Sequence, residues 1–232
     1  MTAGAARPKP RSSDEKKPAD EKGTRERILR VAEQLFAEHG FNGVSVRTLT
    51  AAANVNLAGV SYYFGSKEGL LAAIYDSHCR PMAEERLRRL AACAERKGRA
   101  PLLEQIIAAF VGPALDSTID AVGGGAVFTR LRAMLAHENN ALAKELVETH
   151  FDATSRRFVE ALAACLPELS SEEVLWRFHF LLGTLYYTMI TPDRIVHLSQ
   201  GLCDPSDVAA VMAQMVRFIA AGFRAPTGEH SA

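Results

Sequence analysis

The segment that decides the fold runs from residue 45 to residue 75 and reads SVRTLTAAANVNLAGVSYYFGSKEGLLAAIY. It contains two short helical patterns with a few residues between them. Ser45 is a suitable N-cap for the first, which we expect to continue to about Ala53. Residues 54–57 predict a tight turn, and Asn56 can cap the second short helix. A helix, a tight turn and a second short helix make a helix-turn-helix unit.

The flanking segments complete a small helical domain around this unit. We expect the preceding helix to begin at Thr24 as its N-cap and to stop at Gly40. The second short helix should end near Phe64, and Ser66 should cap a long helix that begins at Lys67. The first helix has an apolar stripe at helical spacing, made of Ile28, Val31, Leu35 and Phe36.

The rest of the chain also has a helical period. No stretch alternates between apolar and polar residues for long enough to predict a strand. Pro113 should kink or break the helix in which it lies. The sequence therefore predicts an all-α protein with about nine helices, and those beyond residue 98 cover about 101–117, 126–137, 140–165, 171–190 and 205–223.

Length and composition are those of a globular protein that can bury a core, with 232 residues of which 48% are hydrophobic. No run approaches the ~20 apolar residues that a membrane span needs, and the charged N-terminus has no signal-peptide pattern. We therefore expect a cytoplasmic protein with no membrane partner. Residues 1–23 are rich in Pro, Lys, Asp, Glu and Ser and predict a disordered tail. The basic residues of this tail either contact DNA or are simply solvated.

Sequence patterns of enzymes and metal sites are missing. There is no GxSxG, HExxH or P-loop motif, and no strand precedes Gly123–Gly125 to make a nucleotide-binding turn. The four cysteines have no CxxC spacing, and the seven histidines have no metal-ligand spacing. We expect neither catalysis nor a cofactor nor a metal.

The charge distribution suits a polyanionic partner at the N-terminal end. Residues 1–67 contain 11 Lys and Arg against 7 Asp and Glu, whereas the remaining residues contain 16 against 20. A recognition helix enters the DNA major groove with its N-terminal residues leading. Small side chains allow the backbone to approach DNA closely at this leading end, which consists of Asn56, Leu57, Ala58 and Gly59.

Three residues around the junction between the second short helix and the next helix are candidates for contacts with DNA phosphates. The hydroxyl groups of Tyr62 and Tyr63 can donate to phosphate oxygens, or both rings can be packing residues. Lys67 lies in the first turn of the next helix, where free N–H groups and the helix dipole favour a phosphate. A solvated lysine is the alternative there.

Residues 24–75 resemble the DNA-binding domain of the TetR family of bacterial transcription regulators. The stretch RILRVAEQLFAEHGFNGVSVRTLTAAANVNLAGVSYYFGSKEGLL carries the resemblance, with Ala32, Phe36, Gly40, Val44, Ser45, Tyr63, Phe64 and Lys67 at matching positions. It implies that Arg47 reads a base edge, since arginine bonds guanine bidentately. It also implies phosphate or groove contacts from Ser45, Thr48, Asn56, Ser61, Tyr62, Tyr63 and Lys67. Many members have tyrosine where this chain has Ser61, so that contact would be shorter, absent or supplied by Tyr62.

The resemblance also divides the chain. It implies a DNA-binding domain over residues 24–84, a ligand-binding and dimerisation domain over residues 85–225, and a flexible end over residues 226–232. Segment 171–190 is apolar on nearly every face, and segment 205–223 has a broad apolar stripe. Two such helices from each subunit would form a four-helix dimer interface, and an intrachain core is the alternative. The predicted interface residues are Leu182, Tyr186, Val211, Met215 and Phe218.

An effector pocket in the larger domain is expected to have an apolar lining with a few polar groups. A buried Arg130 or Arg177 would meet a ligand carboxylate, or would pair with Glu160 or Glu173 as a structural ion pair. The stretch VFTRL…ELVETHF…RRFVEAL…PEL…LWRFHFLLG resembles the PsrA-like, fatty-acid-responsive branch of the family, which implies a fatty acid or acyl-CoA effector. The predicted pocket residues are Phe110, Phe128, Arg130, Met134, Phe151, Trp176 and His179.

These observations predict a ligand-responsive DNA-binding regulator, with repression favoured over activation. It should bind a near-palindromic operator on double-stranded DNA as a homodimer and be released by a small apolar or acyl effector. The alternative is a helical adaptor that keeps a degenerate DNA-binding domain.

Overall fold

The computed structural model of the chain describes residues 18–94, 102–119 and 125–227. Within these ranges it is entirely helical and has no strand, so the predicted all-α class is confirmed. The described residues form ten helices, which are α1 (Pro18–Gly43), α2 (Val46–Ala52), α3 (Ala58–Phe64), α4 (Lys67–Ala94), α5 (Leu103–Ile119), α6 (Gly125–His137), α7 (Ala141–Cys165), α8 (Ser171–Ile190), α9 (Pro192–Leu198) and α10 (Val208–Phe223).

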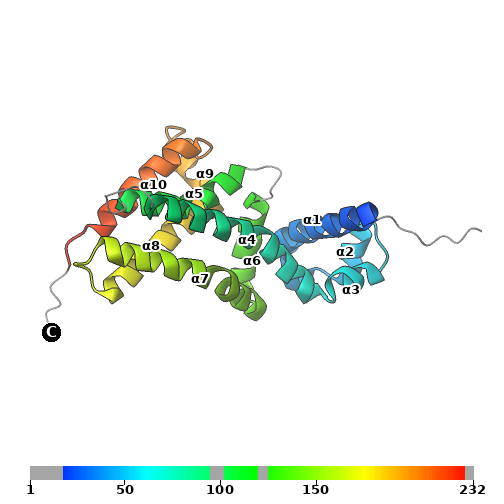
Figure 1. Ribbon diagram of the computed structural model, residues 1–232. Coiled ribbons are helices and arrows are strands. Elements are labelled where there is room, and N and C mark those ends of the chain that lie inside the picture. The colour runs from blue at the N-terminus through cyan, green and yellow to red at the C-terminus, as the bar shows by residue number, and fades with distance from the viewer. Residues whose placement is uncertain (1–17, 95–101, 120–124, 228–232) are drawn as a thin grey trace, which may run out of the picture.

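Helices α1 to α3 lie at one end of the molecule, and α8 and α10 lie toward the other (Figure 1). The long helix α4 runs between the two ends and contacts α1 and α3 as well as α5 and α7. It thus connects the helix-turn-helix unit to the larger helical part. No helix of the described ranges combines the length and apolarity needed to cross a membrane.

The first helix begins earlier than the sequence predicts. It starts at Pro18, so Thr24 lies inside α1 and is not its N-cap. Proline is favoured at the first helical position, and Glu21 close behind it suits the helix dipole. Residues 1–17 of the predicted tail lie outside the described residues. Gly40 has φ 75° and ψ 163°, a conformation open to glycine, and it interrupts the helix where the sequence predicts the stop.

Two features of the larger part differ from the prediction. Pro113 does not break its helix, because α5 continues from Leu103 to Ile119 and is buried on both sides of the proline. Helix α9 is additional to the nine helices that the sequence predicts. It has seven residues, starts with Pro192 and buries none of its side chains, so no apolar period marks it.

The core consists of two hydrophobic clusters. The first joins α1 to α4 with α6 and the start of α7, and includes Phe36, Leu70 and Phe128. The second lies among α5, α7, α8 and α10, and includes Phe110 and Phe158. Helix α4 contributes to both clusters, and α1 packs along α6. The N-terminal helices are therefore packed directly against the larger part through α1 and α4.

Candidate nucleic-acid interface

Helix α2 is fixed by its cap and by one buried anchor. Ser45 Oγ accepts a hydrogen bond from Thr48 N at 3.0 Å and lies 2.8 Å from Thr48 Oγ1, which confirms the predicted cap. Leu49 is buried, whereas Ser45, Arg47 and Thr48 are exposed. The cap and the anchor therefore hold α2 in place and leave its polar side chains facing solvent.

The turn between α2 and α3 is held by its own backbone and by α1. Val55 N donates to Thr50 O at 3.0 Å, and Asn54 has a left-handed φ of 51°, which asparagine tolerates well. Arg27 Nε of α1 donates to Ala53 O at 2.9 Å. Sequence reasoning missed this role of Arg27, because it depends on how α1 crosses α2. Asn56 is exposed and does not cap α3, whose N-cap residue Leu57 makes no side-chain cap hydrogen bond.

Helix α3 has a buried and an exposed face. Gly59 and Val60 are buried against the rest of the unit. A Cβ on Gly59 would lie 3.3 Å from Val55 Cγ2, so Gly59 is a packing position and the prediction that it faces DNA is wrong. The face available to a DNA groove consists of Leu57, Ala58, Ser61 and Tyr62.

The two tyrosines have different environments. Their rings meet edge to face, with centroids 4.8 Å apart. Tyr63 is half-buried against the first core cluster, whereas Tyr62 is 71% exposed. The ring of Tyr63 thus has a packing role, whereas Tyr62 has the more accessible hydroxyl group.

The turn from α3 into α4 depends on two glycines and a cap. Gly65 has φ 75°, and its N–H donates to Ser61 O at 3.0 Å. Ser66 Oγ accepts from Gly69 N at 3.0 Å, as the sequence predicts. A Cβ on Gly69 would overlap with Phe64 O. The close approach of these backbones fixes the angle between α3 and α4.

Two basic side chains near this turn lie against aromatic rings. Lys67 Nζ is 4.2 Å from the centroid of the Phe41 ring, and burial lowers the pKa of Lys67. The ammonium group therefore packs on α1 in this structure instead of extending from the first turn of α4. Arg25 Cζ lies 5.1 Å from the centroid of the Phe64 ring. Arg25 is exposed beside the end of α3 and is a cation that the sequence pattern does not single out.

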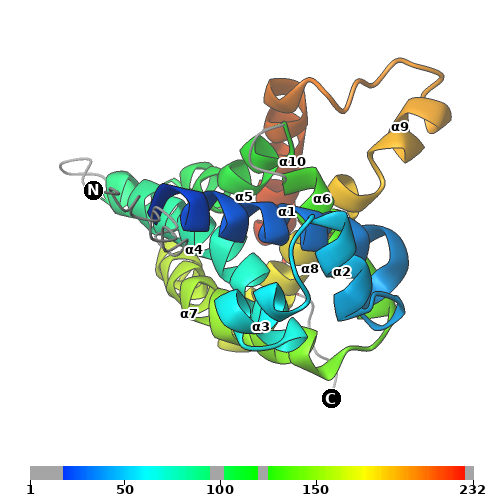
Figure 2. The same ribbon diagram turned by 90° about the vertical axis from the view of Figure 1, so that its right-hand side faces the viewer.

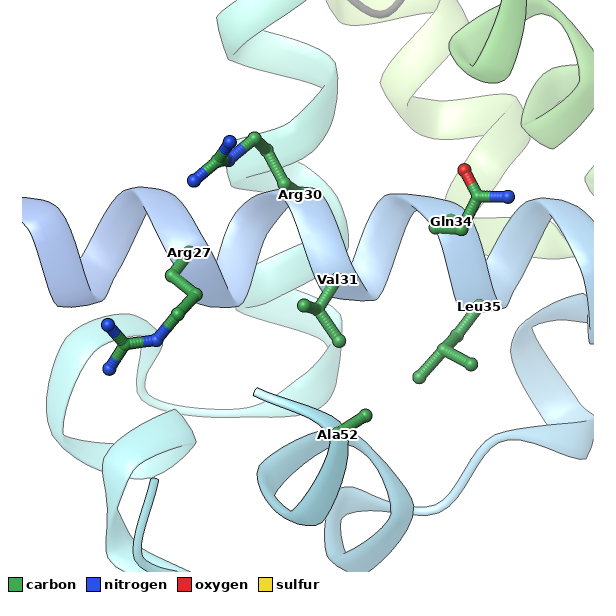
Figure 3. A pocket seen from close by; sticks show the side chains of 6 residues that line it. All are labelled: Arg27, Arg30, Val31, Gln34, Leu35 and Ala52. Atoms are coloured by element: carbon green, nitrogen blue, oxygen red, sulfur yellow. The ribbon is translucent and has the colours of Figure 1, made fainter. Parts of the chain in front are cut away.

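A groove of about 350 Å³ lies between α1 and α2. In Figure 3, Val31 and Leu35 of α1 point toward Ala52 of α2, while Arg27 and Arg30 project to opposite sides of α1. The floor of the groove is apolar, and it lies on the helix-turn-helix unit. It does not contain any residue of the predicted effector pocket.

The structure does not bring the seven predicted pocket residues together. Phe110 belongs to the second core cluster and Phe128 to the first. Met134 and Phe151 are half-buried, whereas Arg130 is exposed. Trp176 and His179 line a depression of about 390 Å³ on the outer side of α8. The seven residues therefore do not line one pocket, because aromatic content does not say which face of a helix points inward.

Arg177 has the structural role that the sequence leaves open. It lies 3.7 Å from the carboxylate of Glu173, and its Nη1 donates to Phe223 O at 2.6 Å and to Ala225 O at 2.9 Å. Arg177 thus caps the end of α10, while Arg157 pairs with Glu160 at 3.1 Å.

Most of the predicted dimer residues remain accessible. Phe218 is 70% exposed and Leu182 is 37% exposed, while Tyr186 and Val211 are half-buried. Met215 is only 6% exposed and belongs to the second core cluster, so its assignment to an interface is wrong. It points from α10 back into the chain.

Comparisons with known proteins agree with this architecture. Residues 28–74 match the family described as "Bacterial regulatory proteins, tetR family", and residues 108–222 match "Tetracyclin repressor-like, C-terminal domain". The probable HTH-type transcriptional regulator YttP of Bacillus subtilis is 46% identical over 48 residues, or 21% of this chain and 23% of that protein. The HTH-type transcriptional repressor AcnR of Corynebacterium glutamicum is 38% identical over 61 residues, or 26% of this chain and 32% of that protein.

These two sequence matches thus span a third or less of the relatives' own lengths. A solved structure covers more. The fatty acid degradation regulator FadR from Bacillus halodurans superposes with a TM-score of 0.59 at 17% identity, covering 91% of this chain and 99% of that one. This likeness concerns the fold. The two family matches, one over the N-terminal helices and one over the larger part, show that the chain belongs to the TetR family of DNA-binding transcriptional regulators.

Proposed function

We propose that this regulator is a repressor that binds a near-palindromic operator as a homodimer and is released by a small apolar or acyl effector. The exposed face of α3 carries the proposal, because Leu57, Ala58, Ser61 and Tyr62 are all open to a DNA groove there. Repression is favoured by the sequence likeness to AcnR, a repressor.

The proposed dimer interface is the outward face of α8 and α10. Trp176, Phe180 and Tyr187 are each more than half exposed along α8, and Phe218 is exposed on α10. Gly183 lies among them, and an added Cβ there would meet nothing, so another helix can approach closely. Helix α9 and the segment after it project from the body (Figure 2). Exposed Leu198 and Leu202 on that projection extend the apolar surface available to a second subunit.

Helices α4 and α6 are the proposed route from the effector to the DNA. The carboxylate of Glu138, just after α6, accepts from Phe41 N at 3.1 Å and from Asn42 N at 3.2 Å, beyond the break at Gly40. His78 of α4 lies 2.9 Å from Glu33 of α1 and stacks on Phe128 of α6. A shift of α6 or α4 would thus move α1 and change the spacing of the recognition helices.

A titration with DNA tests the regulator proposal. The full-length protein is mixed with the DNA that flanks its own gene at several salt concentrations, with random DNA as competitor. Tight, competitor-resistant binding with a steep salt dependence is expected. If the protein bound every segment of its own genome no better than random DNA, the regulator proposal would fail in favour of the adaptor.

Arg47 and Tyr62 should have separable roles in this assay. Arg47→Ala is expected to weaken the free energy of operator binding by roughly 1 to 3 kcal/mol. It should also relax the base preference at one position per half-site. Tyr62→Phe keeps the ring and removes only the hydroxyl. The binding free energy should therefore become weaker by about 1 kcal/mol on every DNA sequence alike. Binding to a set of operators with single base changes measures both effects. Identical profiles for the two variants would contradict the assignment.

A further inference from the structure

Two arginines of the larger part, buried Arg86 and half-buried Arg132, have no acidic partner among the described residues. Arg86 of α4 is 5% exposed, its Nε donates to Phe110 O at 2.8 Å, and its Cζ lies 3.9 Å from the centroid of the Phe110 ring. Arg132 of α6 has a buried Nε with no hydrogen-bond partner. Within the described ranges, neither guanidinium group forms an ion pair with a carboxylate.

The surroundings of Arg132 are aromatic. Its Cζ lies 4.7 Å from the centroid of the Phe151 ring and 5.6 Å from the centroid of the Tyr186 ring. These rings attract the guanidinium group by cation–π interaction, which does not use its N–H groups as hydrogen-bond donors. Arg132 thus has contacts that hold its position, but no carboxylate of the described residues neutralises its charge.

The two positive charges are close enough to repel each other. Burial, with a further contribution from Arg132, lowers the pKa of Arg86 to about 9. Tyr75 and Cys79 beside them stay neutral at neutral pH, because burial raises the pKa of each to about 12. Near neutral pH the cluster is therefore cationic.

The cluster lies where the two hydrophobic cores meet. Tyr75, Cys79, Met82 and Arg86 follow one another on one face of α4 at spacings of three or four residues, and the first two belong to the first cluster whereas Met82 packs on the second. Phe128 and Arg132 lie one turn apart on α6, and the Phe128 ring is 5.2 Å from that of Tyr75. The two arginines thus lie beside buried aromatic side chains at the junction of the two clusters.

Unpaired buried cations are costly, and a planar guanidinium fork matches a carboxylate in both shape and charge. We propose that Arg86 and Arg132 bind the carboxylate of an amphipathic monocarboxylic acid, whose apolar part packs among Tyr75, Phe128, Phe151 and Tyr186. This inference rests on the proposed function and specifies its effector. It selects a free acid over its coenzyme A ester, because the thioester has no carboxylate at the end of the acyl chain.

Calorimetric titration of the full-length protein with hexanoate, decanoate and palmitate tests the proposal, with decanamide and inorganic phosphate as matched probes. At least one of the acids should bind, and decanamide should bind about 30-fold or more weakly than decanoate, because it leaves the buried charges unpaired. Arg132→Met should lower the affinity for the acid by about 30-fold or more. Arg130 is exposed on the same helix, so Arg130→Met should leave the affinity for the acids unchanged.

Thermal unfolding separates loss of the site from loss of the fold. Arg132→Met removes no hydrogen bond from the described residues, so the ligand-free melting temperature should stay the same or rise, and the stabilisation by decanoate should vanish. Equal acid binding by wild type and Arg132→Met would overturn the proposal. So would no binding of any of the three acids, binding of phosphate at the same arginines with equal affinity, or equal binding of decanoyl-CoA. If operator binding persisted in any of these cases, the regulator proposal would stand and only the acid site would fall.

Discussion

Replacing Gly69 with alanine is expected to abolish specific DNA binding and to lower the free energy of unfolding by about 3 kcal/mol. The new Cβ would overlap with Phe64 O, a backbone atom that has no rotamer by which to move away. Relief would require α3 and α4 to separate, which would also disturb the hydrogen bond from Gly69 N to Ser66 Oγ. Because α3 presents the groove-facing residues, a shift of its axis should impair DNA reading even in molecules that stay folded.

Circular dichroism during urea unfolding and titration with operator DNA measure the two effects. Gly23→Ala is the matched control, because an added Cβ at Gly23 meets nothing and the site lies within α1. That change should be neutral or slightly stabilising, by up to about 1 kcal/mol. If Gly69→Ala had the stability and operator affinity of the control, the close approach of α3 and α4 would not be essential for the interface.

The parts of the interface that depend on local sequence can be predicted from it. Ser45 and Ser66 cap their helices as expected, because capping involves residues three apart in the chain. Gly59 and Lys67 differ from expectation because their environments are set by other elements. Gly59 faces Val55 across the turn, and the Lys67 ammonium group lies on the ring of Phe41. Arg27 reaches the turn only because α1 crosses it.

The larger part is harder to predict, because its charged positions look alike in the sequence. Arg86 stands in the segment EERLRR, which resembles a solvated helix face. Only the helical register shared with Tyr75, Cys79 and Met82 indicates that Arg86, and not Arg88, points inward. Arg130 and Arg132 differ by two residues and therefore lie on different faces of α6. The sequence offers no means of choosing between them until the packing of α6 is known.

Replacing Phe218 with glutamate is expected to convert the dimer to a monomer and to weaken operator binding by about 100-fold or more. Phe218 is 70% exposed on α10, so the charge should cost little in the folded monomer, whereas in the proposed four-helix interface it would be buried without a partner. Operator affinity should fall because each half-site would then bind a separate subunit, without the gain from linking two recognition helices. Leu87→Glu, the same change at a 39% exposed position on α4, is the control and should leave the dimer intact.

Sedimentation equilibrium measures the mass of the assembly. The fluorescence emission of the single tryptophan reports whether its face of α8 is buried. Trp176 is 55% exposed on α8 and stacks on Phe180, and both belong to the proposed interface. Its emission should be blue-shifted in the wild-type dimer and move to longer wavelength in Phe218→Glu, because dissociation returns the indole to water. A Phe218→Glu protein that remained a dimer with unchanged emission would place the interface elsewhere. A monomer with unchanged emission would mean that α10, but not the Trp176 side of α8, contacts the second subunit.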